Sequence, residues 1–179
     1  MHLCCAHPGS TRANPTPLSA YARGMTDWLP LTFQRPLRVD VAPGVHIRPI
    51  SADDLDIDMP AVMGNREMLW DKYGEAWGWP PADMSAEEDR EDLARHADEM
   101  TRNESFNYAI LPSDESVLLG CIYIDPPEDA DEGLVADVSW WVVPDAPAGV
   151  ADAVAGFVPA WLSRDWPFDE VRFPFGEVG

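Results

Sequence analysis

The alternation of hydrophobic and polar residues predicts a strand, a loop and a helix between residues 134 and 164. Residues 134–143 are rich in β-branched and aromatic side chains and alternate between two faces, as a β-strand does. Pro144 has no N–H group to donate to a strand ladder, so the strand should end there. One apolar stripe runs along the helix that follows, formed by Val150, Val154, Phe157, Val158, Trp161 and Leu162. Such a unit can hold an anionic ligand at the free N–H groups of its helix, although it is also common scaffolding.

The rest of the chain shows the same kinds of pattern. Four further strands are predicted, at residues 45–50, 106–110, 117–124 and 170–173, the middle two forming a hairpin. Two further helices are predicted. The first should start at the capping-box-like pair Ser51–Asp54 and extend through residues 61–72. The second should start at the pair Ser85–Glu88 and extend to about Arg102. The order is therefore strand, two helices, hairpin, strand, helix, strand. It predicts an α/β (α+β) fold.

Composition narrows the class of protein. The 179 residues include 32 Asp and Glu against 12 Lys and Arg, a formal net charge of -20. Because binding to phosphate backbones needs clustered basic residues, nucleic acid is excluded as an expected partner. No apolar run approaches the roughly 18 residues of a membrane helix. We therefore expect an acidic, soluble, cytoplasmic protein with no membrane partner.

The N-terminal part differs from the remainder. Residues 1–24 contain two Arg, no Asp or Glu and no apolar stretch typical of a secretory signal, so we expect a disordered leader. Met25 is then a candidate natural start. Residues 25–44 are interpreted as an arm whose apolar side chains pack on the domain formed by residues 45–179. Cys4 and Cys5 lie near two histidines in the leader, but adjacent cysteines rarely complete a tetrahedral site, so no metal is expected.

Three segments within this element order carry a family resemblance. They are Ile47-Arg48-Pro49-Ile50, Leu118-Leu119-Gly120-Cys121-Ile122-Tyr123-Ile124 and Val138-Ser139-Trp140-Trp141-Val142. Over residues 45–175 the chain resembles the GNAT family of N-acetyltransferases. This resemblance implies a mixed, mostly antiparallel central sheet flanked by helices, and transfer of an acetyl group from acetyl-CoA to the primary amine of a small molecule or peptide.

The resemblance also implies where acetyl-CoA would bind. The cofactor-binding residues would be Trp141, Val142, Val143, Ala148, Gly149, Val150, Ala151 and Asp152. The sequence departs from the family here, because Ala146 stands where Gln or Arg is expected and no Lys or Arg occurs between Arg102 and Arg164. Asp145 and Asp152 would repel a pyrophosphate. Backbone amides should therefore dominate binding.

Two aspartates are candidate catalytic bases. Asp137 shares a strand face with Ser139, and an uncharged environment around such a carboxylate would perturb its pKa. Asp125, at the end of the preceding strand, is the second candidate. The competing interpretations are a solvent-facing Asp137 and turn chemistry for Asp125 before Pro126. His96 is read as a surface or boundary residue.

An aromatic segment is the candidate acceptor site. Tyr73, Glu75, Trp77 and Trp79 combine rings with a carboxylate, which together can hold a cationic amine. Packing of this loop onto the core is the alternative for each Trp. Trp140 and Trp141 must lie on opposite faces of their strand, so one of them should line the cofactor cleft or cover the other side of the sheet.

The C-terminal end lacks the helix and two strands that usually follow the fifth strand in this family, so we expect a C-terminally truncated fold. The strand at residues 170–173 should therefore leave an edge that either the N-terminal arm covers or a homodimer buries. The same departures support an alternative function, a non-catalytic module for binding or dimerisation. Thermal stabilisation by acetyl-CoA would discriminate the two, because a ligand of the native state raises the melting temperature.

Overall fold

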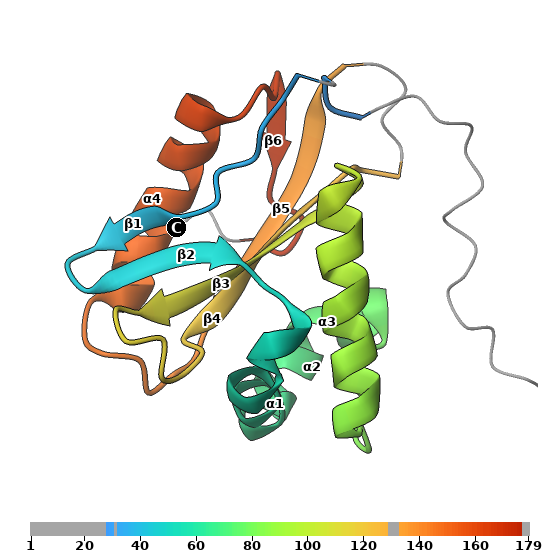
Figure 1. The fold of residues 1–179 in the computed structure, drawn as a ribbon, viewed down its shortest axis with the longest axis vertical. Helices are drawn as coiled ribbons and strands as arrows, with labels where there is room; N and C mark the ends of the chain where they lie inside the picture. Colours follow the sequence, from blue (N-terminus) through green and yellow to red (C-terminus); the bar gives the residue numbers. More distant parts are fainter. Residues whose placement is uncertain (1–27, 31, 129–132, 177–179) are drawn as a thin grey trace, which may run out of the picture.

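The computed structural model describes residues 28–30, 32–128 and 133–176, so the predicted leader lies outside the described residues. Within them the elements are β1 (Val39–Ala42), β2 (Val45–Pro49), the 3₁₀ helix η1 (Ala52–Asp54), α1 (Leu55–Gly64), α2 (Arg66–Trp77), α3 (Ala86–Thr101), β3 (Phe106–Pro112), β4 (Gly120–Asp125), β5 (Val135–Val142), α4 (Val150–Asp165) and β6 (Glu170–Arg172). The strands form one sheet in the order β1-β2-β3-β4-β5-β6 (Figure 1). Neighbours are antiparallel from β1 to β5, and β6 is parallel to β5. The expected mixed, mostly antiparallel sheet is confirmed.

Helices cover both faces of the sheet, with α4 on one face and α1, α2 and α3 on the other (Figure 1). The ring of Trp161 on α4 lies 5.2 Å from that of Tyr108 on β3, and the ring of His96 on α3 lies 6.5 Å from that of Tyr123 on β4. Tyr108 pairs with Ile122, the neighbour of Tyr123, so the two contacts are on opposite faces. Most of the predicted stripe of α4 is buried against the sheet.

The α4 face of the sheet is apolar, whereas the face under α3 is unusually polar. Cross-strand neighbours on the polar face include Asn107, Tyr123 and Ser139 in one row and Asp125 and Asp137 in the next. Asn107 and Ser139 are buried. Because burying polar groups has a free-energy cost, their concentration on one face marks that face as a candidate for chemistry.

The helices before β3 agree with the predicted caps but differ in continuity. The Ser85–Glu88 capping box is present at the start of α3. The first predicted helix is instead divided into η1, α1 and α2, with the break at Asn65. Asn65 has φ −119° and ψ 22°, and its side-chain Nδ2 donates to Ala61 O at 2.8 Å. An amide that bonds to the preceding helical turn competes with continuation of the helix.

The N-terminal arm contains a strand that the sequence analysis did not predict. β1 pairs with β2 through a tight turn in which Gly44 has φ +82°. Before it, the Trp28 ring stacks on Phe168 at 5.4 Å, and its Nε1 donates to Val135 O at 2.8 Å. The arm therefore packs at the end of the sheet where β5 and β6 begin. Among the described residues, no strand pairs with the outer edge of β6.

Within the described part of the chain, no helix has the length and apolar character required to cross a membrane.

Candidate active site

The two parallel strands β5 and β6 are paired over only part of their length. Val135, Ala136 and Asp137 pair with Glu170, Val171 and Arg172, and β6 ends there. β5 continues for five more residues, to Val142, paired with β4 alone among the described strands. Among the described strands, none pairs with the outer edge of β5 after Asp137.

The backbone of this outer edge of β5 has a defined orientation. Val143 N–H donates to Leu119 O at 2.8 Å, which directs the backbone groups of Val143 toward the β4 side. In an antiparallel ladder successive residues alternate, so the N–H and C=O groups of Val142 and Trp140 point away from β4. Lys72 of α2 confirms this direction, because its Nζ donates to Trp140 O at 2.8 Å. This edge therefore carries backbone groups that face away from β4, of which Trp140 O is bonded to Lys72.

The loop after β5 ends in a helix start that is rich in unpaired amides. Gly149, the N-cap residue of α4, has φ +85° and provides no side-chain cap. Val150 N–H donates to Pro147 O at 3.1 Å, but the amides of Ala151 and Asp152 have no backbone acceptor among the described residues. Together with the helix dipole these amides favour an anion. Asp145 and Asp152 are exposed beside them, so this loop has carboxylates where basic side chains would help.

Some of the predicted cofactor-binding residues are exposed and others are buried. Residues 148, 149, 151 and 152 are exposed at the start of α4, whereas Val150 and Val143 are buried. Trp141 is buried on the α3 side of the sheet, and its Nε1 donates to the hydroxyl of Tyr123 at 3.1 Å. The Trp141 side chain therefore lies on the polar face of the sheet. The ring of Trp140 lies on the opposite face, with its centroid 5.8 Å from that of Phe173.

The two predicted catalytic aspartates lie opposite one another. Asp125 on β4 is the direct cross-strand neighbour of Asp137 on β5, at the point where β6 stops pairing. Burial raises the pKa of Asp125 to about 7, helped by the charges of Glu99 and Asp137 and opposed by His96. A carboxyl group that titrates near neutrality can accept a proton at neutral pH and release it again.

α3 adds a histidine to this group. The imidazole Nε2 of His96 lies 3.6 Å from Asp92 Oδ2, and its Nδ1 lies 3.4 Å from Glu99 Oε2. Burial by itself lowers the pKa of His96, but the two carboxylates more than offset this and raise it to about 9. His96 is thus a partly buried cation at neutral pH. The spacing of acidic residues at i−4 and i+3 around His96 was the available sequence signal.

A second buried pair of carboxyl groups lies between α1 and α3. Asp58 and Asp89 are almost fully buried, and burial raises the pKa of both side chains. The sequence analysis did not identify this pair, because Asp58 and Asp89 are 31 positions apart and only the packing of two helices brings them together.

Three of the four predicted acceptor residues form one aromatic group with Tyr123 and Phe175. The rings of Tyr73 and Trp77 are stacked with centroids 4.4 Å apart, and each contacts Phe175, at 4.9 and 5.1 Å. Trp79 lies 6.4 Å from Tyr123. Glu75 is exposed on α2. The rings pack on one another, as the packing interpretation predicted, yet Trp77 keeps 40% of its surface exposed.

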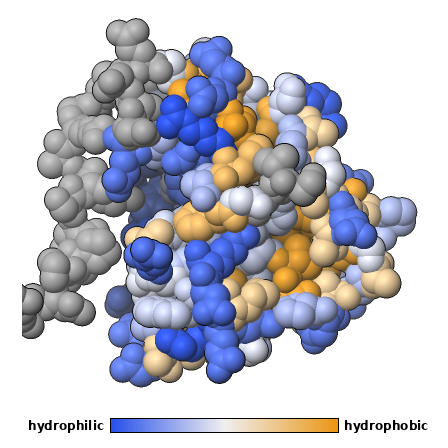
Figure 2. Space-filling model, turned by 180° about the vertical axis from the view of Figure 1, so that it is seen from behind, coloured by the Kyte–Doolittle hydropathy of each residue, from blue (hydrophilic) through white to orange (hydrophobic). Residues whose placement is uncertain are grey.

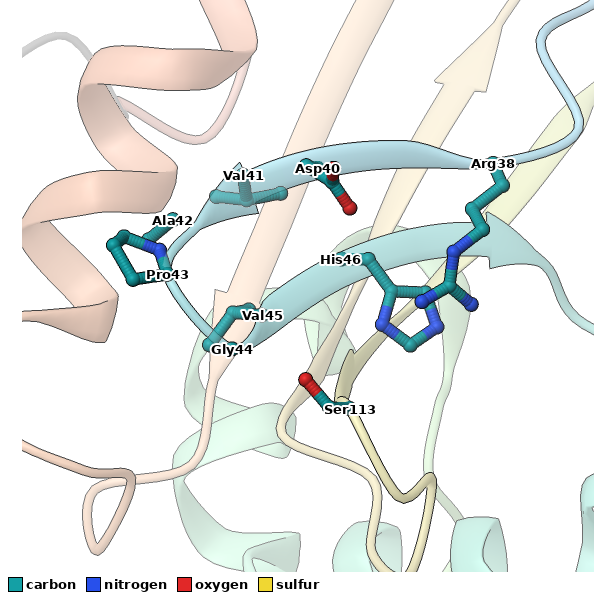
Figure 3. A pocket seen from close by; sticks show the side chains of 9 residues that line it. All are labelled: Arg38, Asp40, Val41, Ala42, Pro43, Gly44, Val45, His46 and Ser113. Atoms are coloured by element: carbon teal, nitrogen blue, oxygen red, sulfur yellow. The ribbon is translucent and has the colours of Figure 1, made fainter.

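Two hollows in the surface lie away from this group. The larger, about 350 Å³, is at the β1–β2 hairpin, on the opposite edge of the sheet from β6 (Figure 3). Beside it, Glu115 binds His46 at 2.8 Å and Arg48 at 2.9 Å. The smaller, about 260 Å³, lies between α4 and β6. On the face opposite to that of Figure 1, apolar patches interrupt a hydrophilic surface (Figure 2).

In the described residues, no group of His, Cys, Asp and Glu has the arrangement to hold a metal ion.

Comparison with known proteins identifies a family and a set of similar folds. The sequence profile of the acetyltransferase (GNAT) domain matches residues 45–174. A ribosomal-protein alanine acetyltransferase from Vibrio fischeri has 15% identity and a TM-score of 0.50, over 67% of this chain and 64% of that one. The chain therefore spans less than two-thirds of that relative. No curated protein matches the sequence.

Some of the similar structures contain coenzyme A or its acetyl thioester. The RimL ribosomal α-N-protein acetyltransferase in complex with coenzyme A has 16% identity and a TM-score of 0.56, over 71% of this chain and 68% of that one. The microcin C7 self-immunity acetyltransferase MccE, in complex with acetyl-CoA and AMP, has 8% identity and a TM-score of 0.57, over 72% and 67%. At these identities the similarity establishes the fold.

Proposed function

The chain belongs to the GNAT acetyltransferase family, and from this premise we propose that it transfers the acetyl group of acetyl-CoA to a primary amine. The observation that carries the proposal is the partial pairing of β5 with β6, after which no described strand pairs with the outer edge of β5 from Val138 to Val142, next to the start of α4. A pantetheine arm can lie along that edge and pair with its N–H and C=O groups. When bound, acetyl-CoA supplies a thioester whose carbonyl carbon is open to an amine.

The start of α4 has features that favour the diphosphate of acetyl-CoA and features that oppose it. The amides from Ala148 to Asp152 and the dipole of α4 suit an anion. The exposed carboxylates of Asp145 and Asp152 oppose it. We infer that binding rests on backbone amides, with an affinity that depends on salt less than that of a site built from Lys and Arg.

The Asp125–Asp137 pair supplies the base in this proposal. Asp125 is the proton acceptor, because its raised pKa lets it take a proton from an ammonium group near neutral pH. Asp137, opposite it at the vertex where β5 leaves β6, raises that pKa through its charge. The amide N–H of Trp140 points away from β4 and would polarise the thioester carbonyl.

The acceptor in this proposal is a cationic amine on a protein, a peptide or a small molecule. The similar structures include acetyltransferases named for the ribosomal proteins that they modify. Here, the net charge of -20 attracts cations, and the exposed ring of Trp77 beside Tyr73 and Phe175 presents an aromatic surface for one.

A second candidate function is a non-catalytic GNAT-fold binding module. The two exposed aspartates at the start of α4 favour it, since they oppose an anionic cofactor. Under this alternative, acetyl-CoA neither binds nor stabilises the protein.

Calorimetric titration of the full chain with acetyl-CoA tests the proposal. Binding of one equivalent, a rise in melting temperature and release of coenzyme A thiol in the presence of amine-bearing peptides are the expected results. Titration with no heat and no change in melting temperature would establish the non-catalytic alternative.

A further inference from the structure

The imidazole of His96 lies over the polar face of the sheet, close to the proposed base. Its ring centroid is 6.5 Å from that of Tyr123 on β4. Side chains two positions apart on a strand share a face, so Asp125 is the next residue of β4 on the face that α3 covers. The β4–β5 register places Asp137 directly opposite it. His96 therefore lies above the part of β4 that carries the base.

Two carboxylates of α3 hold His96 in this position. Its Nε2 lies 3.6 Å from Asp92 Oδ2, and its Nδ1 lies 3.4 Å from Glu99 Oε2. Glu99 is itself anchored, because its Oε2 accepts a hydrogen bond from Ser105 Oγ at 3.0 Å. Ser105 directly precedes β3, and the β3–β4 register places it beside Asp125. These contacts connect the imidazole to the end of β4.

The other charged groups around His96 and Asp125 do not replace this cation. They come from α1, α3, β4 and β5, and they are Asp58, Asp89, Asp92, Arg95, Glu99, Tyr123 and Asp137. Burial raises the pKa of Asp58, of Asp89 and of Tyr123, which favours their uncharged forms. Arg95 pairs with the same two carboxylates as His96, but its side chain is half-exposed. Burial is the main cause of the raised pKa of Asp125, and His96 opposes it more strongly than Arg95 does.

We propose that His96 is a positioning residue for acetyl transfer: the cation that Asp92 and Glu99 hold above β4 keeps Asp125 able to accept a proton at neutral pH. This inference rests on the proposed function, because it concerns the proton transfer of that reaction. The proton passes from the acceptor ammonium to a carboxylate oxygen of Asp125. His96 exchanges no proton and touches no reacting atom. Without its charge, Asp125 would hold a proton of its own at neutral pH and could not take one from the amine.

NMR titration of the full chain without acetyl-CoA tests the inference first. The Asp125 carboxyl carbon, assigned by its loss in Asp125→Asn, is followed against pH in the native chain and in His96→Gln. An opposite charge close to a carboxyl group lowers its pKa by about 1–3 units, so His96→Gln should raise the Asp125 midpoint by about one unit. Arg95→Gln is the matched control. It removes a cation from the same two carboxylates and should move the midpoint less.

The native chain provides a second measurement that needs no variant. Burial alone would lower the pKa of His96, but the two carboxylates raise it to about 9, so its imidazole signals should titrate well above pH 7. The pH profile of acetyl transfer provides a third. If the Asp125 midpoint rises by about one unit, His96→Gln should reduce the rate at pH 7 by about fivefold, and the difference should shrink toward pH 9.

Three results would overturn the inference. One is an Asp125 midpoint that His96→Gln leaves unchanged or moves no more than Arg95→Gln does. Another is a native His96 that titrates below pH 7, since it would carry no charge when the reaction runs. The last is a pH profile of acetyl transfer that stays the same although the Asp125 midpoint has moved. A native chain that shows the expected midpoints but transfers no acetyl group would instead overturn the proposed function.

Discussion

Replacing Asp125 by Asn should make the protein more stable at alkaline pH while it removes the proposed base. In the folded chain, burial raises the pKa of Asp125 to about 7 from an ordinary 3.8. Between these values the unfolded chain has lost the proton and the folded chain retains it, so the free energy of unfolding falls as pH rises. The full difference corresponds to about 4 kcal/mol above pH 7. This is an upper limit, because part of the Asp125 surface remains accessible to water.

Asn cannot ionise, so the variant should not show this loss of stability. Urea denaturation of both proteins between pH 4 and pH 9 measures their free energies of unfolding. The variant should gain stability over the wild type as pH rises from about 4 to about 7, and the gain should stay constant above that. Acetyl transfer should fall by about 10²–10⁴-fold, and the wild-type rate should rise with pH through about 7. Asp83→Asn, at an exposed turn, is the control. A variant that is no more stable than the wild type at pH 8 would refute the assigned burial of this charge.

Three further changes test the arm and the start of α4. Gly149→Ala should destabilise the protein by about 1 kcal/mol, because φ is +85° at this position. Gly156→Ala, inside α4, is the control and should stabilise the protein by a similar amount. Equal effects of the two substitutions in thermal melts would exclude a special backbone conformation at Gly149. Asp152→Lys should tighten acetyl-CoA binding several-fold at low salt and less at high salt; calorimetry that shows unchanged affinity would place the phosphates elsewhere. Trp28→Phe should cost about 1 kcal/mol in urea denaturation, since the bond to Val135 O is lost while the ring stacking remains; no loss would mean that the arm is dispensable.

Local patterns were sufficient to predict much of the fold. The alternation in residues 134–143 placed Trp140 and Trp141 on opposite faces, because side-chain direction in a strand depends only on sequence parity. The Ser85–Glu88 box fixed the start of α3 for a similar reason, since both bonds lie within four residues. β1 was not predicted, because four residues are too few to show a clear alternation of polar and apolar side chains. It forms a strand because it pairs with β2.

The candidate site depends on register and packing, which local patterns do not determine. Asp125 and Asp137 were both candidates from sequence, but their direct opposition requires the β4–β5 register. His96 was interpreted as a surface or boundary residue, and the structure gives it two carboxylate neighbours and a raised pKa. The contact of Lys72 with Trp140 spans 68 positions and arises only when α2 crosses the end of β5. The stretch of β5 that no described strand pairs on its outer edge depends on where β6 stops.

The most direct test of the proposed site is amide hydrogen exchange with and without acetyl-CoA. The account predicts that acetyl-CoA slows exchange in residues 138–142 of β5 and 148–152 at the start of α4, and leaves the β1–β2 hairpin unchanged. Protection at residues 38–46, beside the 350 Å³ hollow, with none along β5, would contradict it.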